Sequence, residues 1–196
     1  VDDGSTDSSP AVLRDYSARD HRLRPFLQAH RGLIPALNFG LDRCSAPLTA
    51  RMDADDLCHP DRLRAQLAFL RDHADLSVVG SLVRGFPESQ LREGFRIYIE
   101  WQNSLLTPED LAREIYIECP LAHPSVMMRS DELRALGGYV ERGWPEDYEL
   151  FLRYHHAGKR FGKVPEVLLN WRDRPDRLTR ADSRYSVENF LRAKAH

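Results

Sequence analysis

The sequence predicts an α/β fold in which a mostly parallel sheet is flanked by helices. Two observations lead to this prediction. Short apolar or alternating segments, typical of strands, alternate along the chain with segments whose leucines recur every three or four residues, typical of helices. The acidic cluster 53–56 directly follows one of the predicted strands, where open α/β sheets bind their ligands.

The composition is that of one globular domain. The chain has 196 residues, 42% of them hydrophobic and 30% charged, and we expect residues 1–196 to form a single domain. Its 28 basic and 30 acidic residues give a net charge of -2, which argues against nucleic-acid binding through a general basic field. No apolar run reaches the roughly 18 residues of a transmembrane helix. Three widely spaced cysteines favour a reducing compartment, and we expect a cytoplasmic protein.

Helices and strands alternate in the first half of the chain. Ser9 and Pro10 are typical of a helix start, and this helix should end near Arg19. Leucines spaced by four predict a second helix over 32–44, and Pro60 opens a third with leucines on one face. The predicted strands between and after these helices are 23–28, 47–52 and 77–83.

The second half begins with a polar loop over 85–94. Thr107 to Asp110 forms a predicted capping box that opens a helix to about Ile115. Further helices are predicted over 146–157, where Gly158 stops the helix, and over 185–194, whose apolar side should pack on the body. The predicted strands are 95–101, 125–128 and 163–171.

Asp53, Asp55 and Asp56 form the densest group of candidate functional residues. Carboxylates this close together need a compensating cation or hydrogen-bond donors. Asp53 and Asp55 could bind Mg²⁺ or Mn²⁺ together with phosphate oxygens and water. The other interpretation is an exposed acidic turn that caps the helix at Pro60.

The order of motifs along the chain resembles a known family. Asp2-Asp3-Gly4-Ser5 follows an apolar residue, and Met52-Asp53-Ala54-Asp55-Asp56 comes some fifty residues later. Three segments and a dipeptide continue the pattern, namely 36–40, 123–129, 144–150 and Trp171-Arg172. Together they resemble the family 2 glycosyltransferases, which have the GT-A fold. The resemblance implies a nucleotide-sugar part over 1–84, an acceptor and catalytic part over 85–180 and a C-terminal helix over 181–196. It also implies that a strand-helix unit of about 35 to 45 residues precedes Val1 in the whole protein.

The resemblance assigns the donor site to the acidic motifs. Asp2 or Asp3, with Ser5, would contact the uracil ring or ribose of a UDP-sugar. Asp55 would bind the metal ion, and Asp53 would contact the ribose or share the metal. Leu37 stands where many relatives have an arginine, and Arg31 could supply that charge instead.

The resemblance places the chemistry later in the chain. Asp147 would be the catalytic base, with Glu146 as a neighbour that orients it or contacts the sugar. Trp144 and His123 could contact the sugar or the acceptor, although a packed tryptophan and a buried histidine are equally consistent with the sequence. The basic run after the last strand could clamp the diphosphate through Arg172 and Arg180.

The function we expect is therefore metal-assisted, inverting transfer of a sugar from a nucleotide-sugar to an acceptor hydroxyl. The acceptor could be a glycan, a lipid-linked sugar or another hydroxyl compound. A nucleotidyltransferase uses the same type of sheet and metal and remains an alternative, as does a nucleotide-binding fragment without activity. A phosphatase with an aspartate nucleophile would need a lysine and further acidic positions at spacings that the sequence lacks.

Overall fold

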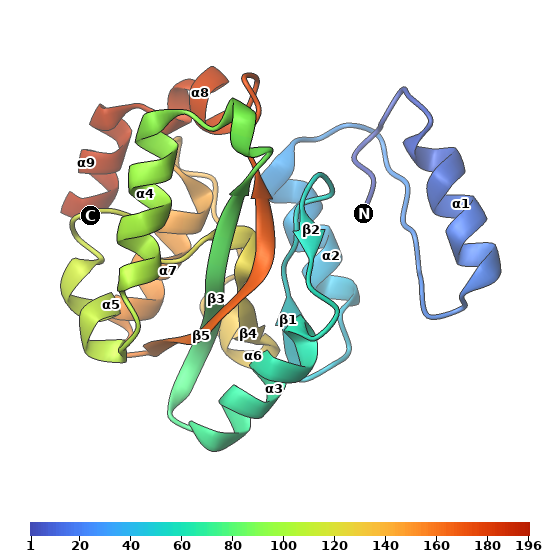
Figure 1. Cartoon of the computed structure of the whole chain (residues 1–196). Helices are drawn as coiled ribbons and strands as arrows, with labels where there is room; N and C mark the ends of the chain where they lie inside the picture. The colour runs from blue at the N-terminus through green and yellow to red at the C-terminus, as the bar shows by residue number, and fades with distance from the viewer.

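The computed structural model describes residues 1–196, and its centre is a five-stranded sheet with the order β1-β4-β3-β5-β2. The two long strands, β3 (Leu76–Phe86) and β5 (Arg160–Arg172), lie side by side in the middle (Figure 1). The three short strands are β1 (Leu48–Ala50), β2 (Leu57–Cys58) and β4 (Met127–Arg129). The α/β class is confirmed.

The prediction of a mostly parallel sheet is wrong in its detail. Only β3 and β5 pair in parallel, whereas the β1–β4, β3–β4 and β2–β5 pairs are antiparallel. β1, β3 and β5 therefore run in one direction, and the reversed strand β4 lies between β1 and β3. The apolar pattern that predicts a strand carries no information on its direction, which is why these reversals escape the sequence.

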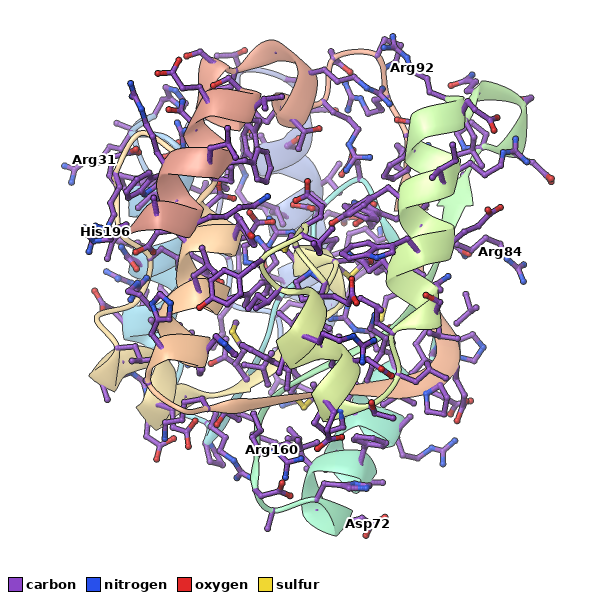
Figure 2. All side chains as sticks on the ribbon, turned by 90° about the vertical axis from the view of Figure 1, so that its left-hand side faces the viewer. Arg31, Asp72, Arg84, Arg92, Arg160 and His196 are labelled. Atoms are coloured by element: carbon purple, nitrogen blue, oxygen red, sulfur yellow. The ribbon has the colours of Figure 1, made fainter.

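Helices cover both faces of the sheet. Figure 1 shows α4, α5, α7 and α9 on one side of β3 and β5. The buried residues of α2 belong to the same apolar cluster as those of α5 and α7, whereas Leu70 of α3 packs with Val79 and Val164 on the other face. Figure 2 looks onto the first side, where side chains of α4, α5 and α9 fill the space between these helices. The helices are α1 (Ser9–Arg19), α2 (Leu33–Arg43), α3 (Arg62–Asp72), α4 (Glu93–Ser104), α5 (Pro108–Glu114), α6 (Ser130–Ala135), α7 (Glu146–His156), α8 (Leu178–Ala181) and α9 (Val187–Ala195), with 3-10 turns η1 (Glu88–Gln90), η2 (His123–Ser125) and η3 (Ser183–Tyr185).

Several predicted elements are confirmed. The helices at 9–19, 32–44 and 146–157 are present within one or two residues of the predicted bounds. The capping box at Thr107 is also present, because its hydroxyl accepts from the backbone N–H of Asp110 while the Asp110 carboxylate accepts from that of Thr107.

Two predicted strands are wrong. Residues 95–101 lie in helix α4, whose inward face carries Ile99 and Gln102, while Ile97 is exposed. The apolar residues of this segment alternate over a short stretch, and that pattern cannot exclude a helix. Residues 23–28 form no strand of the sheet and make only an isolated parallel bridge between Asp2 and Leu27. The predicted loop over 85–94 is shorter than expected, since β3 runs to Phe86.

Helix α7 is the most deeply buried helix of the fold. Tyr148, Phe151 and Tyr154 are fully buried in the largest apolar cluster, and the hydroxyl of Tyr148 donates to the carbonyl oxygen of Ile115 at 2.5 Å. The N-terminal turn of α7 is thereby fixed to the end of α5, while Phe151 and Tyr154 pack on Phe161 of β5. No helix in the structure is both long and apolar enough to cross a membrane.

Candidate functional site

A cavity of about 300 Å³ lies where β1, β5 and α7 come together. We call it the carboxylate cavity, because several carboxylates line it, among them Asp53, Asp55, Asp56 and Asp147. Its other lining residues come from the start of α2, from the segment after β1, from η2, from the start of α7, from the end of β5 and from the segment that follows β5, and they are Leu33, Arg51, His123, Pro124, Glu146, Trp171, Arg172, Arg174, Asp176, Arg177, Leu178, Thr179 and Tyr185. Residues from five widely separated parts of the sequence thus meet in one cavity.

The acidic loop after β1 is held by the end of β5. The backbone N–H of Arg172 donates to Oδ1 of Asp56 at 2.8 Å, and its Nε donates to the backbone oxygen of Asp55 at 2.6 Å. Oδ2 of Asp55 lies 3.9 Å from a guanidinium nitrogen of Arg174. These contacts leave the carboxylates of Asp53 and Asp55 on the cavity wall.

Asp56 is the buried member of the acidic loop. Its Oδ2 atom has no hydrogen-bond partner. Burial, with the nearby charges of Asp53 and Asp55, raises the pKa of Asp56 to about 7. The loop therefore concentrates more negative charge than its protein neighbours compensate.

Arg51 provides the cationic contact of this loop. Its guanidinium lies 2.5 Å from Oδ2 of Asp53, and its side chain is only 10% exposed. The spacing of two residues along an extended segment puts both side chains on the same side of the chain. Arg51 also contributes to lowering the pKa of His123, after the larger effect of burial.

The carboxylates of the acidic loop decide whether a divalent cation could bind in the cavity. No group of three or more His, Cys, Asp or Glu side chains is arranged to hold a metal ion. Mg²⁺ and Mn²⁺, however, are commonly held by one or two carboxylates together with phosphate oxygens and water. The carboxylates of Asp53 and Asp55 suit such an ion when a diphosphate supplies further oxygens.

The N-terminal turn of α7 forms the opposite wall. Glu146 is buried, with Tyr185 donating to its Oε2 at 2.7 Å and Nδ1 of His123 lying 3.9 Å from its Oε1. Oδ1 of Asp147 accepts from the backbone N–H of Tyr148 at 2.8 Å. Burial, with the neighbouring charge of Glu146, raises the pKa of Asp147 to about 7.

His123 and the basic segment complete the lining. Burial holds the pKa of His123 well below its usual value, so its ring is neutral, and its Nε2 lies 2.9 Å from the hydroxyl of Tyr139. Arg172 lines the carboxylate cavity, and its contact with a diphosphate stays a prediction. Arg180 does not line it, because its guanidinium pairs with buried Asp173 at 2.7 Å.

The N-terminal motif lies outside the lining of this cavity. Asp2 closes a turn by accepting from the backbone N–H groups of Gly4 and Ser5. Asp3 accepts from the backbone N–H groups at the start of α2, with Gly32 donating at 2.7 Å. Ser5 is exposed. Arg31 is exposed as well and points outward (Figure 2).

Trp144 also lies outside the cavity. It packs against the main apolar cluster and lies 5.4 Å from the ring of His196. The packed tryptophan was one of the two interpretations that the sequence left open.

Sequence reasoning missed Arg51 and Tyr185. The signal for Arg51 was its position two residues before Asp53, next to a strand whose side chains alternate. Tyr185 carried no such signal, because it reaches Glu146 across 39 positions of sequence.

A comparison with protein families identifies the group to which this site belongs. The family model described as glycosyl transferase family 2 matches residues 1–136. The chain belongs to glycosyl transferase family 2. The match contains the acidic loop and His123 and ends before α7.

Curated relatives of this family 2 chain extend the similarity. It is 30% identical over 154 residues to an Erwinia amylovora protein named amylovoran biosynthesis glycosyltransferase AmsE, covering 79% of this chain and 55% of that one. It is 33% identical over 195 residues to a Bacillus subtilis protein named glycosyltransferase EpsE, covering 97% of this chain and 67% of that one. The chain thus spans about half to two thirds of the length of these relatives.

Solved structures show the same fold. Staphylococcus aureus TarS in complex with UDP-GlcNAc superposes with a TM-score of 0.73 at 17% identity, over 98% of this chain and 53% of that one. The mannosyltransferase PcManGT of Pyrobaculum calidifontis, in complex with GDP-Man and Mn²⁺, gives a TM-score of 0.62 at 20% identity, over 87% of this chain and 46% of that one. The family 2 chain therefore has the fold of these glycosyltransferases.

Proposed function

We propose that this family 2 chain transfers a sugar from a UDP-sugar to an acceptor hydroxyl, with inversion at the anomeric carbon. One observation carries the proposal. The carboxylate cavity contains Asp53 and Asp55 on one wall and, on another, the Asp147 carboxylate with a pKa near 7. The similarity to TarS, solved with UDP-GlcNAc, supports a nucleotide-sugar donor.

The acidic loop is the donor side of the proposed site. Asp55, together with Asp53, would hold a Mg²⁺ or Mn²⁺ ion, and the Mn²⁺ in the PcManGT complex supports this assignment. When bound, the ion would neutralise charge on the departing diphosphate. Arg172 is fixed beside Asp55 by its Nε hydrogen bond, and its remaining guanidinium N–H groups can donate to a diphosphate oxygen.

The N-terminal turn would hold the nucleoside. Both carboxylate oxygens of Asp3 already accept hydrogen bonds, from Gln28 and from the backbone of Arg31 and Gly32. Asp2 uses only Oδ1 in its turn, so its Oδ2 is the better acceptor for the uracil ring N–H or a ribose hydroxyl. We therefore assign the nucleoside contact to Asp2, with Asp3 and Ser5 shaping the turn.

Asp147 would act as the base on the acceptor side. Its carboxylate takes the proton of the acceptor hydroxyl while that oxygen forms a bond to the anomeric carbon. The bond from this carbon to the diphosphate oxygen breaks on the opposite face, and the electron pair leaves with UDP. A pKa near 7 suits this role, because the group is substantially ionised at neutral pH yet basic enough to accept a proton.

Glu146 and His123 would support the base. Glu146 is held by the Tyr185 hydroxyl, and its negative charge contributes to the raised pKa of Asp147. His123 is neutral at pH 7 and faces the cavity, so it can donate to or accept from a sugar hydroxyl without adding charge.

The donor assignment is tested by titrating UDP into the protein by calorimetry, with and without Mn²⁺. We expect Mn²⁺ to tighten UDP binding to the parent chain and to have no such effect in Asp55→Asn. Asp72→Asn is the matched control, because Asp72 is exposed at the end of α3, and it should behave as the parent.

Equal Mn²⁺ dependence in Asp55→Asn would overturn the donor assignment, and tighter binding of GDP than of UDP would replace uridine by guanosine. Release of pyrophosphate from UTP and a sugar phosphate would instead establish a nucleotidyltransferase.

A further inference from the structure

A second cavity, of about 360 Å³, adjoins the carboxylate cavity. We call it the aromatic cavity, because five aromatic side chains line it: Phe95, Tyr98, Trp171, Tyr185 and Phe190. They come from α4, the end of β5, η3 and α9. Asp53, Asp55 and Asp56 do not reach it.

The two cavities share a wall. Asp147, Trp171, Arg177, Thr179 and Tyr185 line both of them. Tyr185 donates to Glu146, and burial raises the pKa of its hydroxyl far above neutral. Asp147 is therefore the group of this wall that can accept a proton at neutral pH, and it can do so from a molecule in either cavity.

The aromatic walls are held in place before any ligand binds. The rings of Phe95 and Trp171 pack edge to face with centroids 5.0 Å apart, and the Arg177 guanidinium lies 4.2 Å and 4.7 Å from these two centroids. The Tyr98 hydroxyl donates to the carbonyl oxygen of Cys119 at 2.8 Å. Rigid aromatic walls with polar groups at their edges suit a ligand that has apolar faces and a polar rim.

The arginines around the aromatic cavity are already paired with a carboxylate. Arg180 pairs with Asp173 at 2.7 Å, and Arg177 lies 3.9 Å from the same carboxylate. The lining also contains the carboxylates of Glu118 and Asp147. No arginine is left free to balance an anionic ligand, so an uncharged ligand is favoured.

We propose that the aromatic cavity binds the acceptor of the transfer reaction as an uncharged pyranose ring, with one hydroxyl directed to Asp147. This inference rests on the proposed function. The ring's C–H faces pack on the aromatic walls, and its hydroxyl groups meet Thr179, Glu118 and Asp147. The volume lies at the lower end of the usual range for ligand sites, about 300–1,000 Å³, which suits one or two sugar units.

The proposal is tested by saturation-transfer NMR on the whole chain with UDP and Mn²⁺ present. The probes are methyl glycosides of glucose, galactose, mannose and N-acetylglucosamine, with methyl glucuronoside as the charged comparison. We expect at least one neutral glycoside to bind and the glucuronoside to bind at least about tenfold more weakly.

Two cavity variants and one control locate the binding. Phe95→Ala and Phe190→Leu should each weaken glycoside binding by about fivefold to tenfold, because each removes an aromatic contact. Ile97→Ala is the matched control on α4, since Ile97 is 56% exposed and lies outside the cavity. It should bind the glycoside as the parent does, and UDP affinity should be the same in all four proteins.

The outcomes separate this inference from the proposed function. If the parent chain does not bind UDP, the proposed transfer from a UDP-sugar is contradicted. Intact UDP binding with no neutral glycoside bound, or with binding unaffected by both cavity variants, overturns the acceptor site alone.

The source of the pyranose is resolved by a second arm, in which the same sugar is carried on a polyprenyl diphosphate in detergent. An equal effect of Phe95→Ala on both forms assigns recognition to the sugar. An effect confined to the lipid-linked form would contradict recognition of the ring.

Discussion

The hydroxyl of Tyr185 donates a 2.7 Å hydrogen bond to Oε2 of Glu146, joining the segment after β5 to the N-terminal turn of α7. Glu146 is buried, so this bond supplies a donor to a carboxylate that has little access to water. Tyr185 also lines both the carboxylate and the aromatic cavity. The C-terminal part of the chain therefore completes the site that the acidic loop begins.

Tyr185→Phe should lower the free energy of unfolding by about 1–3 kcal/mol, because it leaves the buried Glu146 carboxylate without this donor. Urea denaturation measures the change. Tyr116→Phe is the matched control, since the hydroxyl of Tyr116 meets His156 in an exposed contact, and its effect should stay below about 0.5 kcal/mol. Equal effects of the two substitutions would show that the Tyr185 bond does not stabilise the site.

The pKa of Asp147 predicts the pH dependence of stability. The pKa of about 7 in the folded protein lies above the 3.8 that an aspartate has in water, so the folded state retains a proton that the unfolded state releases. The stability due to this group is complete below pH 3.8 and is lost as the pH rises through 7. Asp147→Asn should therefore unfold less readily than the parent at pH 8, by about 1 kcal/mol or more. Denaturation curves at pH 5 and pH 8 check this, and an equal difference between the two proteins at both pH values would contradict it.

Arg51 and Asp53 form an ion pair, so their contributions to the free energy of unfolding should be coupled. Because Arg51 is nearly buried and Asp53 is 38% exposed, we expect a coupling free energy of about 1–2 kcal/mol, below that of a fully buried pair. A double-mutant cycle with Arg51→Met and Asp53→Asn measures it. The pair Arg64 and Asp61 on the surface is the control and should couple by less than about 0.5 kcal/mol. Additive effects in the Arg51 cycle would contradict the pair.

The elements that could be predicted are those with a local signal. Short stretches of sequence are enough to predict the capping box at Thr107, the leucine stripe of α2 and the acidic residues after β1. The sequence predicts a strand over 95–101 because the apolar residues of this segment alternate. In the structure the segment lies in helix α4, with Ile99 buried and Ile97 exposed, and the sequence alone does not show this difference in burial.

The same distinction between local and long-range signals applies to the candidate site. The motifs pointed to Asp53, Asp55 and Asp147, and the structure brings them to one cavity. Arg180 was expected there as well, but pairing with buried Asp173 holds it away. Asp173 contacts Arg180, and Tyr185 contacts Glu146, only because the fold brings these residues together. No local pattern in the sequence predicts either contact.

The central claim is that Asp147 removes the proton from the acceptor in an inverting transfer from a UDP-sugar. The most direct measurement is the rate of transfer by the parent and by Asp147→Asn, with UDP affinity determined on the same samples and the anomeric configuration of the product read by NMR. We predict a loss of about 10²- to 10⁴-fold in rate with UDP affinity unchanged, and a β-linked product from an α-linked donor. Transfer by Asp147→Asn at the parent rate, or an α-linked product from the parent, would contradict the account.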